Sequence, residues 1–334
     1  MPSVAALGAA LFLLSLFSIA SGVMNLPLSQ ALLTIGDQLF GSEASRLKSH
    51  EQAVIWELRL PRTLLAVLVG VLLAQSGAVM QGLFRNPLAD PGVIGVSSGA
   101  AVGAVAAIFF SPLSATWWTV PISAFIGGFL CSVFVYRLAH SQLGTSVLVL
   151  LLAGIALTAM AQAIIGLFSY LSDDTRLRNL TMWQLGSVAG ANGTKVWIAL
   201  IAALLLCWRF QFRAAALNAM LLGEAEARHL GIDVENLKRE LIVLVALGVG
   251  LAVACGGIIS FLGLVVPHAV RSINGPDHRS LLPLAALLGG LLLLCADIVA
   301  RLAVQPAELP VGLLTALLGA PFFILLLLQL KDRM

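Results

Sequence analysis

The chain has 334 residues, of which 60% are hydrophobic and only 10% are charged. Soluble domains carry about a quarter charged residues, so this composition excludes a soluble globular protein and indicates a helical integral membrane protein. The net charge of +3 is small and the 19 basic residues are scattered, which argues against a nucleic-acid-binding surface.

Apolar stretches long enough to cross a bilayer predict an all-α membrane protein with about ten transmembrane helices, in one domain covering residues 1–334. The first stretch has no basic region before it, so it is interpreted as a membrane helix, with a cleaved signal peptide as the weaker alternative. Helix boundaries are least defined between residues 239 and 272, where Gly256-Gly257 and Pro267 interrupt the apolar run. In chain order the predicted spans are 4–23, 63–83, 93–110, 117–138, 146–170, 194–210, 239–256, 258–272, 281–303 and 310–330.

Small residues recur within these spans and permit two helix backbones to approach closely. This packing is compatible with a channel, a transporter or a scaffold, so it does not select a function. The glycines concerned are Gly70, Gly77, Gly99, Gly103, Gly127, Gly128, Gly248, Gly250, Gly256, Gly257, Gly289 and Gly290.

An even number of helices places both termini on one side of the membrane, and Lys and Arg are enriched on the cytoplasmic side. Their distribution favours cytoplasmic termini by a small margin, mainly because the polar loop at about 211–238 is the largest connection and is rich in basic residues. The arginines that this topology places outside need a separate explanation.

The sequence contains no motif for an enzymatic reaction. It has no phosphate-binding loop and no Gly-Lys dipeptide, so any ATP-driven work requires a separate subunit. Metalloprotease and nucleophile-elbow motifs are absent, and the four cysteines lie singly in apolar runs. We therefore expect no catalytic residue, no metal site and no cofactor.

The polar loop predicts a short amphipathic helix on the membrane surface that ends at Gly231. Its pattern Leu-Gly-Glu-x-x-Ala-x-x-Leu-Gly, residues 222–231, resembles the coupling segment of permease subunits in bacterial ATP-binding-cassette (ABC) importers for iron chelates, haem and cobalamin. Further blocks resemble the same family in the same order along the chain. They are Arg59-Leu-Pro-Arg62, Gly77–Gln81, Asn86–Gly92, Leu152–Gly154, Phe261–His268, Asp277–Arg279, Ala296-Asp297, Glu308–Pro310 and Gly319–Pro321.

The resemblance implies a ten-helix subunit of the bacterial inner membrane that pairs with a second copy of itself, with the substrate path along the dimer axis. It also implies two cytoplasmic ATPase subunits and a periplasmic substrate-binding protein as partners. The ATPase subunits would dock on the loop that contains Gly223, Glu224, Ala227, Leu230 and Gly231.

Three arginines placed outside, Arg59, Arg62 and Arg301, match family positions that meet acidic residues on the binding protein. Cations opposite carboxylates orient a complex and speed its formation. The alternative is that Arg59 and Arg62 extend to the membrane interface, and that Arg301 pairs with Asp297 one helical turn away.

Two further positions are candidates for the substrate path. Arg176 and Arg178 follow the fifth span in a segment that resembles the haem-specific branch, and haem carries two propionates that arginines can bind. The alternative is a solvated loop in which Asp173 and Asp174 neutralise them. Thr145-Ser146 resembles a constriction at the cytoplasmic end of the path, and the alternative is an ordinary pair of residues that begins a helix.

The leading hypothesis is therefore haem import by a permease without covalent chemistry of its own. A cobalamin or ferric-siderophore permease is the alternative within the family, because the shared blocks describe the machine rather than its cargo. An autonomous ion-coupled transporter is disfavoured, since Asp297 is the only acidic residue well inside a span.

Overall fold

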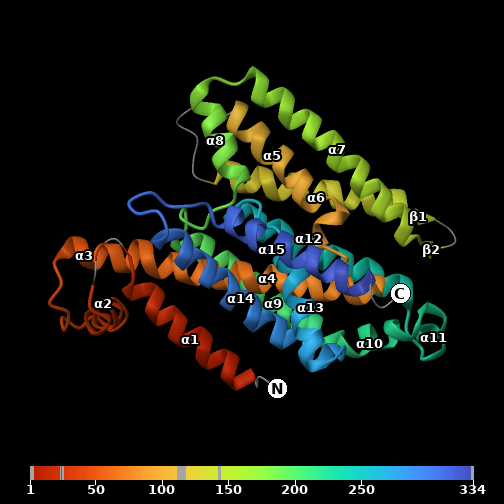
Figure 1. Ribbon diagram of the computed structural model, residues 1–334, viewed down its shortest axis with the longest axis horizontal. Helices are drawn as coiled ribbons and strands as arrows, with labels where there is room; N and C mark the ends of the chain where they lie inside the picture. Colours follow the sequence, from red (N-terminus) through yellow and green to blue (C-terminus); the bar gives the residue numbers. More distant parts are fainter. Residues whose placement is uncertain (1–3, 23, 25, 111–117, 142–143, 332–334) are drawn as a thin grey trace.

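The computed structural model describes residues 4–22, 24, 26–110, 118–141 and 144–331, and most of them are helical (Figure 1). Two short strands form an antiparallel hairpin. The elements are α1 (Val4–Ala20), α2 (Leu28–Phe40), α3 (Ser49–Ala53), the π-helix η1 (Val54–Arg59), α4 (Leu60–Phe84), the 3-10 helix η2 (Pro91–Ile94), α5 (Val96–Phe110), α6 (Thr119–Ala139), β1 (His140–Ser141), β2 (Gly144–Thr145), α7 (Val147–Leu171), α8 (Asp174–Gln184), α9 (Gly193–Phe212), α10 (Ala214–Leu222), α11 (Glu224–His229), α12 (Val234–Gly256), α13 (Leu262–Asn274), α14 (His278–Leu302) and α15 (Val311–Lys331).

Each predicted span overlaps one α-helix, namely α1, α4, α5, α6, α7, α9, α12, α13, α14 or α15. Within the described residues, six helical segments have the length and hydropathy to cross a membrane: α6, α7, α9, α12, α14 and the continuous segment Ser49–Phe84. Helices α1, α5 and most of α15 are apolar but shorter, and α13 has 13 residues. The helical membrane fold is thus confirmed, and the number of crossings stays a prediction. Val23 and Trp117, at the ends of two predicted spans, lie outside the described residues.

The polar segment after the fifth span is a helix rather than a loop, although most of its polar residues are exposed. The carboxylate of Asp173 accepts a hydrogen bond of 2.8 Å from the Arg176 amide and begins α8 as its N-cap. Leu180 is fully buried in a cluster with Ala101 and Val105 of α5, which fixes α8 against the membrane helices.

Helix α4 is the centre of the fold. It continues α3 and η1 without interruption. In this continuous segment, Ser49–Phe84, 78% of the 18-residue apolar stretch is buried inside the chain. Its apolar residues occur on all sides of the helix, as expected for a helix that is surrounded. Helices α9, α12, α13 and α14 pack around it, and Figure 1 shows it crossing the middle of the bundle.

Helix backbones touch at several of the predicted glycines, whereas Gly248, Gly250 and Gly256 face side chains. A Cβ atom added at Gly77 would lie 1.8 Å from the carbonyl oxygen of Gly263, and one at Gly70 would lie 2.3 Å from that of Gly289. The pair α5 and α6 meets in the same way, with 2.5 Å between a Cβ at Gly99 and the oxygen of Gly127. No side chain fits at these contacts, so the predicted role of these glycines in close packing is confirmed.

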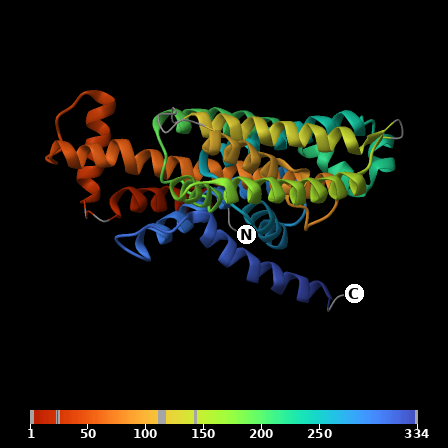
Figure 2. The same cartoon turned by 90° about the horizontal axis from the view of Figure 1, so that it is seen from above.

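The two ends of the bundle carry different elements. Helices α10 and α11 and the β1–β2 hairpin lie at one end, where α15 also ends, and α2 and α3 lie at the other (Figure 1). Val4 at the start of α1 lines a cavity with Trp208 and Phe212 of α9, which places it at the α10 end. Helix α15 diverges from the rest of the bundle (Figure 2).

We predict that Gly77→Ala destabilises the chain by about 1–3 kcal/mol, because the added methyl group forces α4 and α13 apart. The expected result is a lower apparent melting temperature in detergent. Gly166→Ala on α7 is the control, since among the described residues nothing apart from the neighbouring backbone of α7 itself lies within 4 Å of a Cβ at that position. Equal melting temperatures for the two variants would contradict the close contact.

Candidate functional site

One buried carboxylate organises the end of the bundle near α3. Asp297 of α14 is fully buried and pairs with Arg62 of α4 at 2.9 Å and with Arg301 at 3.1 Å. Arg62 also contacts Glu308 at 2.7 Å. The alternative of an Arg301–Asp297 pair along one helix is confirmed. Asp297 therefore has two cationic partners, which is the condition for keeping a buried charge.

Arg59 and Arg301 stabilise the end of α1. The last carbonyl groups of a helix have no partner within it, and cations are favoured there. Arg59 donates to the carbonyl oxygens of Ile19 at 2.9 Å and Ala20 at 2.7 Å, and to that of Met24. Arg301 donates to the hydroxyl of Ser18 at 2.7 Å. No local motif predicts this role; the one signal for it in the sequence is that α1 has no basic residue of its own in its last turn.

This arrangement bears directly on the predicted docking residues. Arg59 and Arg301 are only 6% and 7% exposed, and their guanidinium groups bind acceptors of the same chain. Arg62 is little more exposed and is held by Asp297 and Glu308. A binding protein would have to displace these internal acceptors, so docking at the three arginines stays a prediction.

The predicted substrate-path arginines both lie on α8, but they are not brought together. Residues two apart on a helix do not face each other. Arg176 pairs with Asp173 at 3.5 Å, and its guanidinium carbon lies 5.7 Å from the centre of the Phe109 ring. Arg178 is exposed. Neutralisation by Asp173 thus holds for Arg176, and the role of either arginine toward cargo stays a prediction.

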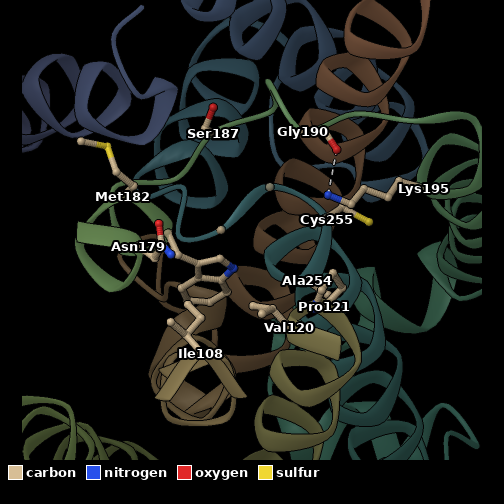
Figure 3. A pocket seen from close by; sticks show the side chains of 13 residues that line it. Ile108, Val120, Pro121, Asn179, Met182, Ser187, Gly190, Lys195, Ala254 and Cys255 are labelled. Carbon is tan, nitrogen blue, oxygen red and sulfur yellow. Dashed lines mark hydrogen bonds between the residues drawn. The ribbon is translucent and has the colours of Figure 1, made fainter. Parts of the chain in front are cut away.

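The same helix borders a cavity of about 420 Å³ between α5, α6, α8, α9 and α12 (Figure 3). Asn179, Met182 and Trp183 of α8 line it, whereas Arg176 and Arg178 do not. Its basic group is Lys195 at the start of α9, whose Nζ donates to the carbonyl oxygen of Gly190 at 2.9 Å. The cavity therefore combines apolar walls, one indole ring and one ammonium group.

Thr145 and Ser146 lie at the opposite end, at the junction of the hairpin and α7. The Ser146 hydroxyl accepts from the Val149 amide at 3.4 Å, so the alternative role as a helix N-cap is confirmed for Ser146. Thr145 is buried and donates to Glu235 of α12 twice, from its amide at 3.0 Å and its hydroxyl at 2.9 Å. Thr145 is thus attached to α12.

The predicted coupling segment forms two helices rather than one. Gly223, with φ of 120°, separates α10 from α11, and Gly231, with φ of 82°, follows the end of α11. Ala227 is fully buried in the main hydrophobic cluster, so it packs the segment onto the bundle and presents no surface to a partner. Leu222 and Leu230 are the large apolar side chains that this segment exposes at either end of α11.

One ion pair joins the coupling segment to α12, and an acidic residue begins α12. Glu224 contacts the ammonium group of Lys238 at 2.7 Å. Asp233 begins α12 by accepting a hydrogen bond from the Asn236 amide at 3.1 Å. Hydrogen bonds from the Asn236 amide and side chain lower the pKa of Asp233, so this cap stays ionised at neutral pH.

We predict that Asp297→Asn lowers the stability of the chain by about 3–5 kcal/mol, because it leaves Arg301 buried without its counter-charge. Thermal unfolding in detergent would show a large fall in melting temperature. Glu43→Gln, which neutralises an exposed carboxylate near α2, should leave the melting temperature unchanged. A small effect of Asp297→Asn would show that the pair contributes little.

Comparison with known proteins agrees with this arrangement. The sequence profile of the FecCD transport family matches residues 10–329. The chain is 47% identical over 287 residues to the hemin transport system permease protein HmuU of Yersinia pestis, and the alignment covers 84% of each chain. It is 42% identical over 287 residues to the vitamin B12 import system permease protein BtuC of Klebsiella pneumoniae, and this alignment covers 86% of each chain. A solved metal-chelate type ABC transporter in an inward-facing conformation matches with a TM-score of 0.84 and 33% identity, covering 98% of each chain. The chain therefore belongs to the FecCD transport family and is the permease subunit of an ABC importer.

Proposed function

We propose that this permease moves haem from the periplasm to the cytoplasm. The observation that carries the proposal is the 47% identity to a hemin permease along 84% of the chain, against 42% to 43% for the vitamin B12 permeases. Cobalamin or a ferric siderophore is the alternative cargo, since both groups of relatives align over similar lengths. The cargo passes through the protein without covalent change.

The proposal includes a second copy of the chain as partner. Helix α15 packs against α13 and α14 and otherwise diverges from the bundle (Figure 2). Its outward face carries Leu317, Leu318, Ile324, Leu325 and Leu328, all exposed. A helix with so little support from its own chain is suited to packing against another subunit, and a path between two copies would give haem apolar walls.

Orientation follows from the position of the coupling segment. We place the α10–α11 end in the cytoplasm, where two ATPase subunits would each bind one permease copy. The start of α1 and the end of α15 lie at this same end. The opposite end then faces the periplasm in the inner membrane, and a binding protein would approach Arg62 by competing with Glu308 for its guanidinium group.

We expect ATPase binding to depend on the exposed apolar side chains beside α11. Leu230→Glu should abolish co-purification with the ATPase subunit and leave the melting temperature unchanged, because Leu230 is 64% exposed and supports no core contact. The matched control is Leu39→Glu on α2, where the leucine is 63% exposed at the other end. Retention of the ATPase by Leu230→Glu would remove α11 as its docking site.

The cargo can be tested in vesicles that contain the complete complex. We expect uptake of haem and not of cobalamin, and a several-fold slower uptake when Arg176 and Arg178 are both replaced with alanine. A charge-assisted hydrogen bond contributes roughly 1.5–3 kcal/mol when desolvated, and less at an exposed position. ATP hydrolysis stimulated by the binding protein should persist in this variant. Transport of cobalamin alone would overturn the haem assignment, and full haem uptake in the variant would remove the arginines from the path.

A further inference from the structure

A buried ammonium group lies where three elements of the α10–α11 end meet. Lys238 of α12 is only 3% exposed. Its Nζ lies 2.7 Å from Oε1 of Glu224 on α11, 3.4 Å from Oε1 of Glu235 on α12, and 3.2 Å from the carbonyl oxygen of Thr145 in β2. The three acceptors thus come from α11, α12 and the hairpin.

The buried ammonium group of Lys238 constrains the positions of Glu224, Glu235 and the Thr145 carbonyl group. An ammonium group has three donors, and burying it is costly unless they are paired. Lys238 has three acceptors for three donors, and two of them are carboxylates. Moving α11 or the hairpin alone would leave the buried charge without part of its compensation. Lys238 therefore makes the positions of these two elements depend on each other.

Glu235 extends the connection to the start of α7. Its Oε1 faces Lys238, and its Oε2 accepts from the amide and hydroxyl of Thr145. A Cβ atom at Gly144 would lie 2.8 Å from this carboxylate, and Gly144 has φ of 106°, so a glycine suits this position beside the Glu235 side chain. Ser146, the residue after Thr145, is the N-cap of α7.

Helix α7 is the element that such a connection can move. Only 22% of the 18-residue apolar stretch of α7 is buried inside the chain, compared with 67% of the corresponding stretch of α12. A helix with few internal contacts shifts at lower cost than one in the core. The order of contacts is therefore Glu224 on α11, Lys238 and Glu235 on the firmly packed α12, and Thr145 at the entrance to the loosely packed α7.

We propose that Lys238 is the positioning residue that couples movement of α11 to the β1–β2 hairpin and to α7. The inference rests on the proposed function, in which α11 binds the ATPase subunit. When the bound ATPase displaces α11, the Glu224 carboxylate moves relative to Lys238, and the ammonium group redistributes its contacts between Glu224, Glu235 and the Thr145 carbonyl. The hairpin and the start of α7 move in consequence.

The connection can be measured first in the purified chain without its partners. Hydrogen exchange at the Thr145 amide should be about tenfold faster in Lys238→Met, equivalent to about 1.4 kcal/mol of lost local stability. It should also be faster, by at least about twofold, in Glu224→Gln, although that residue lies on another helix and does not touch Thr145. The matched control is Arg239→Met, because Arg239 is exposed and contacts Asn236.

The second measurement uses the complete complex in vesicles and records haem uptake per ATP hydrolysed. We expect Lys238→Met to lower this ratio about tenfold, with the ATPase still bound and ATP hydrolysis within about twofold of wild type. Lys238→Arg, which restores a cation, should recover part of the ratio. A purely structural role would instead reduce assembly, uptake and hydrolysis together.

Two results would overturn the inference: unchanged Thr145 exchange in Glu224→Gln, or an unchanged uptake ratio in Lys238→Met. Should Lys238→Met not fold, the exchange measurement on Glu224→Gln decides alone, because its carboxylate is partly exposed and its loss leaves the core intact. Failure of the proposed function has a different signature, since the wild-type chain would then bind no ATPase or transport no haem. The exchange measurement on the purified chain would still report on the connection.

Discussion

The structure depends on direct contact between helix backbones. Lipid tails are as apolar as leucine side chains, so membrane helices associate through close packing rather than through the exclusion of water. At Gly77 and Gly70, α4 approaches α13 and α14 to distances that exclude even a methyl group. These contacts hold α4 at the centre, and α12 packs beside it. The functional residues at both ends of the bundle are mounted on this group of helices.

Buried charges attach the peripheral elements to that central group. At one end, Arg301 of α14 and Arg59 of η1 bind the end of α1, and Asp297 compensates Arg301. At the other end, Lys238 connects α11 and the hairpin to α12. Removing one partner of a buried pair is strongly destabilising, whereas weakly packed helices can still move as units. The protein thus combines a rigid centre with attached segments whose movement is restricted to particular contacts.

Most of the fold could be predicted because the membrane imposes simple requirements. A crossing helix needs about 20 apolar residues, and every predicted span overlaps a helix. Helix α8 was not predicted, because its residues are mostly polar and do not form the long apolar stretch by which membrane helices are identified. Its N-cap Asp173 and the buried Leu180 were the available signals. The division of the coupling segment at Gly223 was not predicted either. The loop has two glycines, Gly223 and Gly231, and the sequence alone does not show that both of them end a helix.

The sequence by itself determined the membrane class, the absence of a phosphate-binding loop and the ABC permease family, because these depend on composition and on short local motifs. Only the tertiary structure decided what the charged residues contact. Arg59 and Arg301 are in motifs that suggested an exposed docking surface, yet they bind carbonyl groups of α1 that lie 40 and 283 residues away in the sequence. No sequence pattern predicts that Lys238 is buried or which residues it contacts. The partners of a buried charge are set by which helices pack together, and this information is distributed over contacts far apart in the chain.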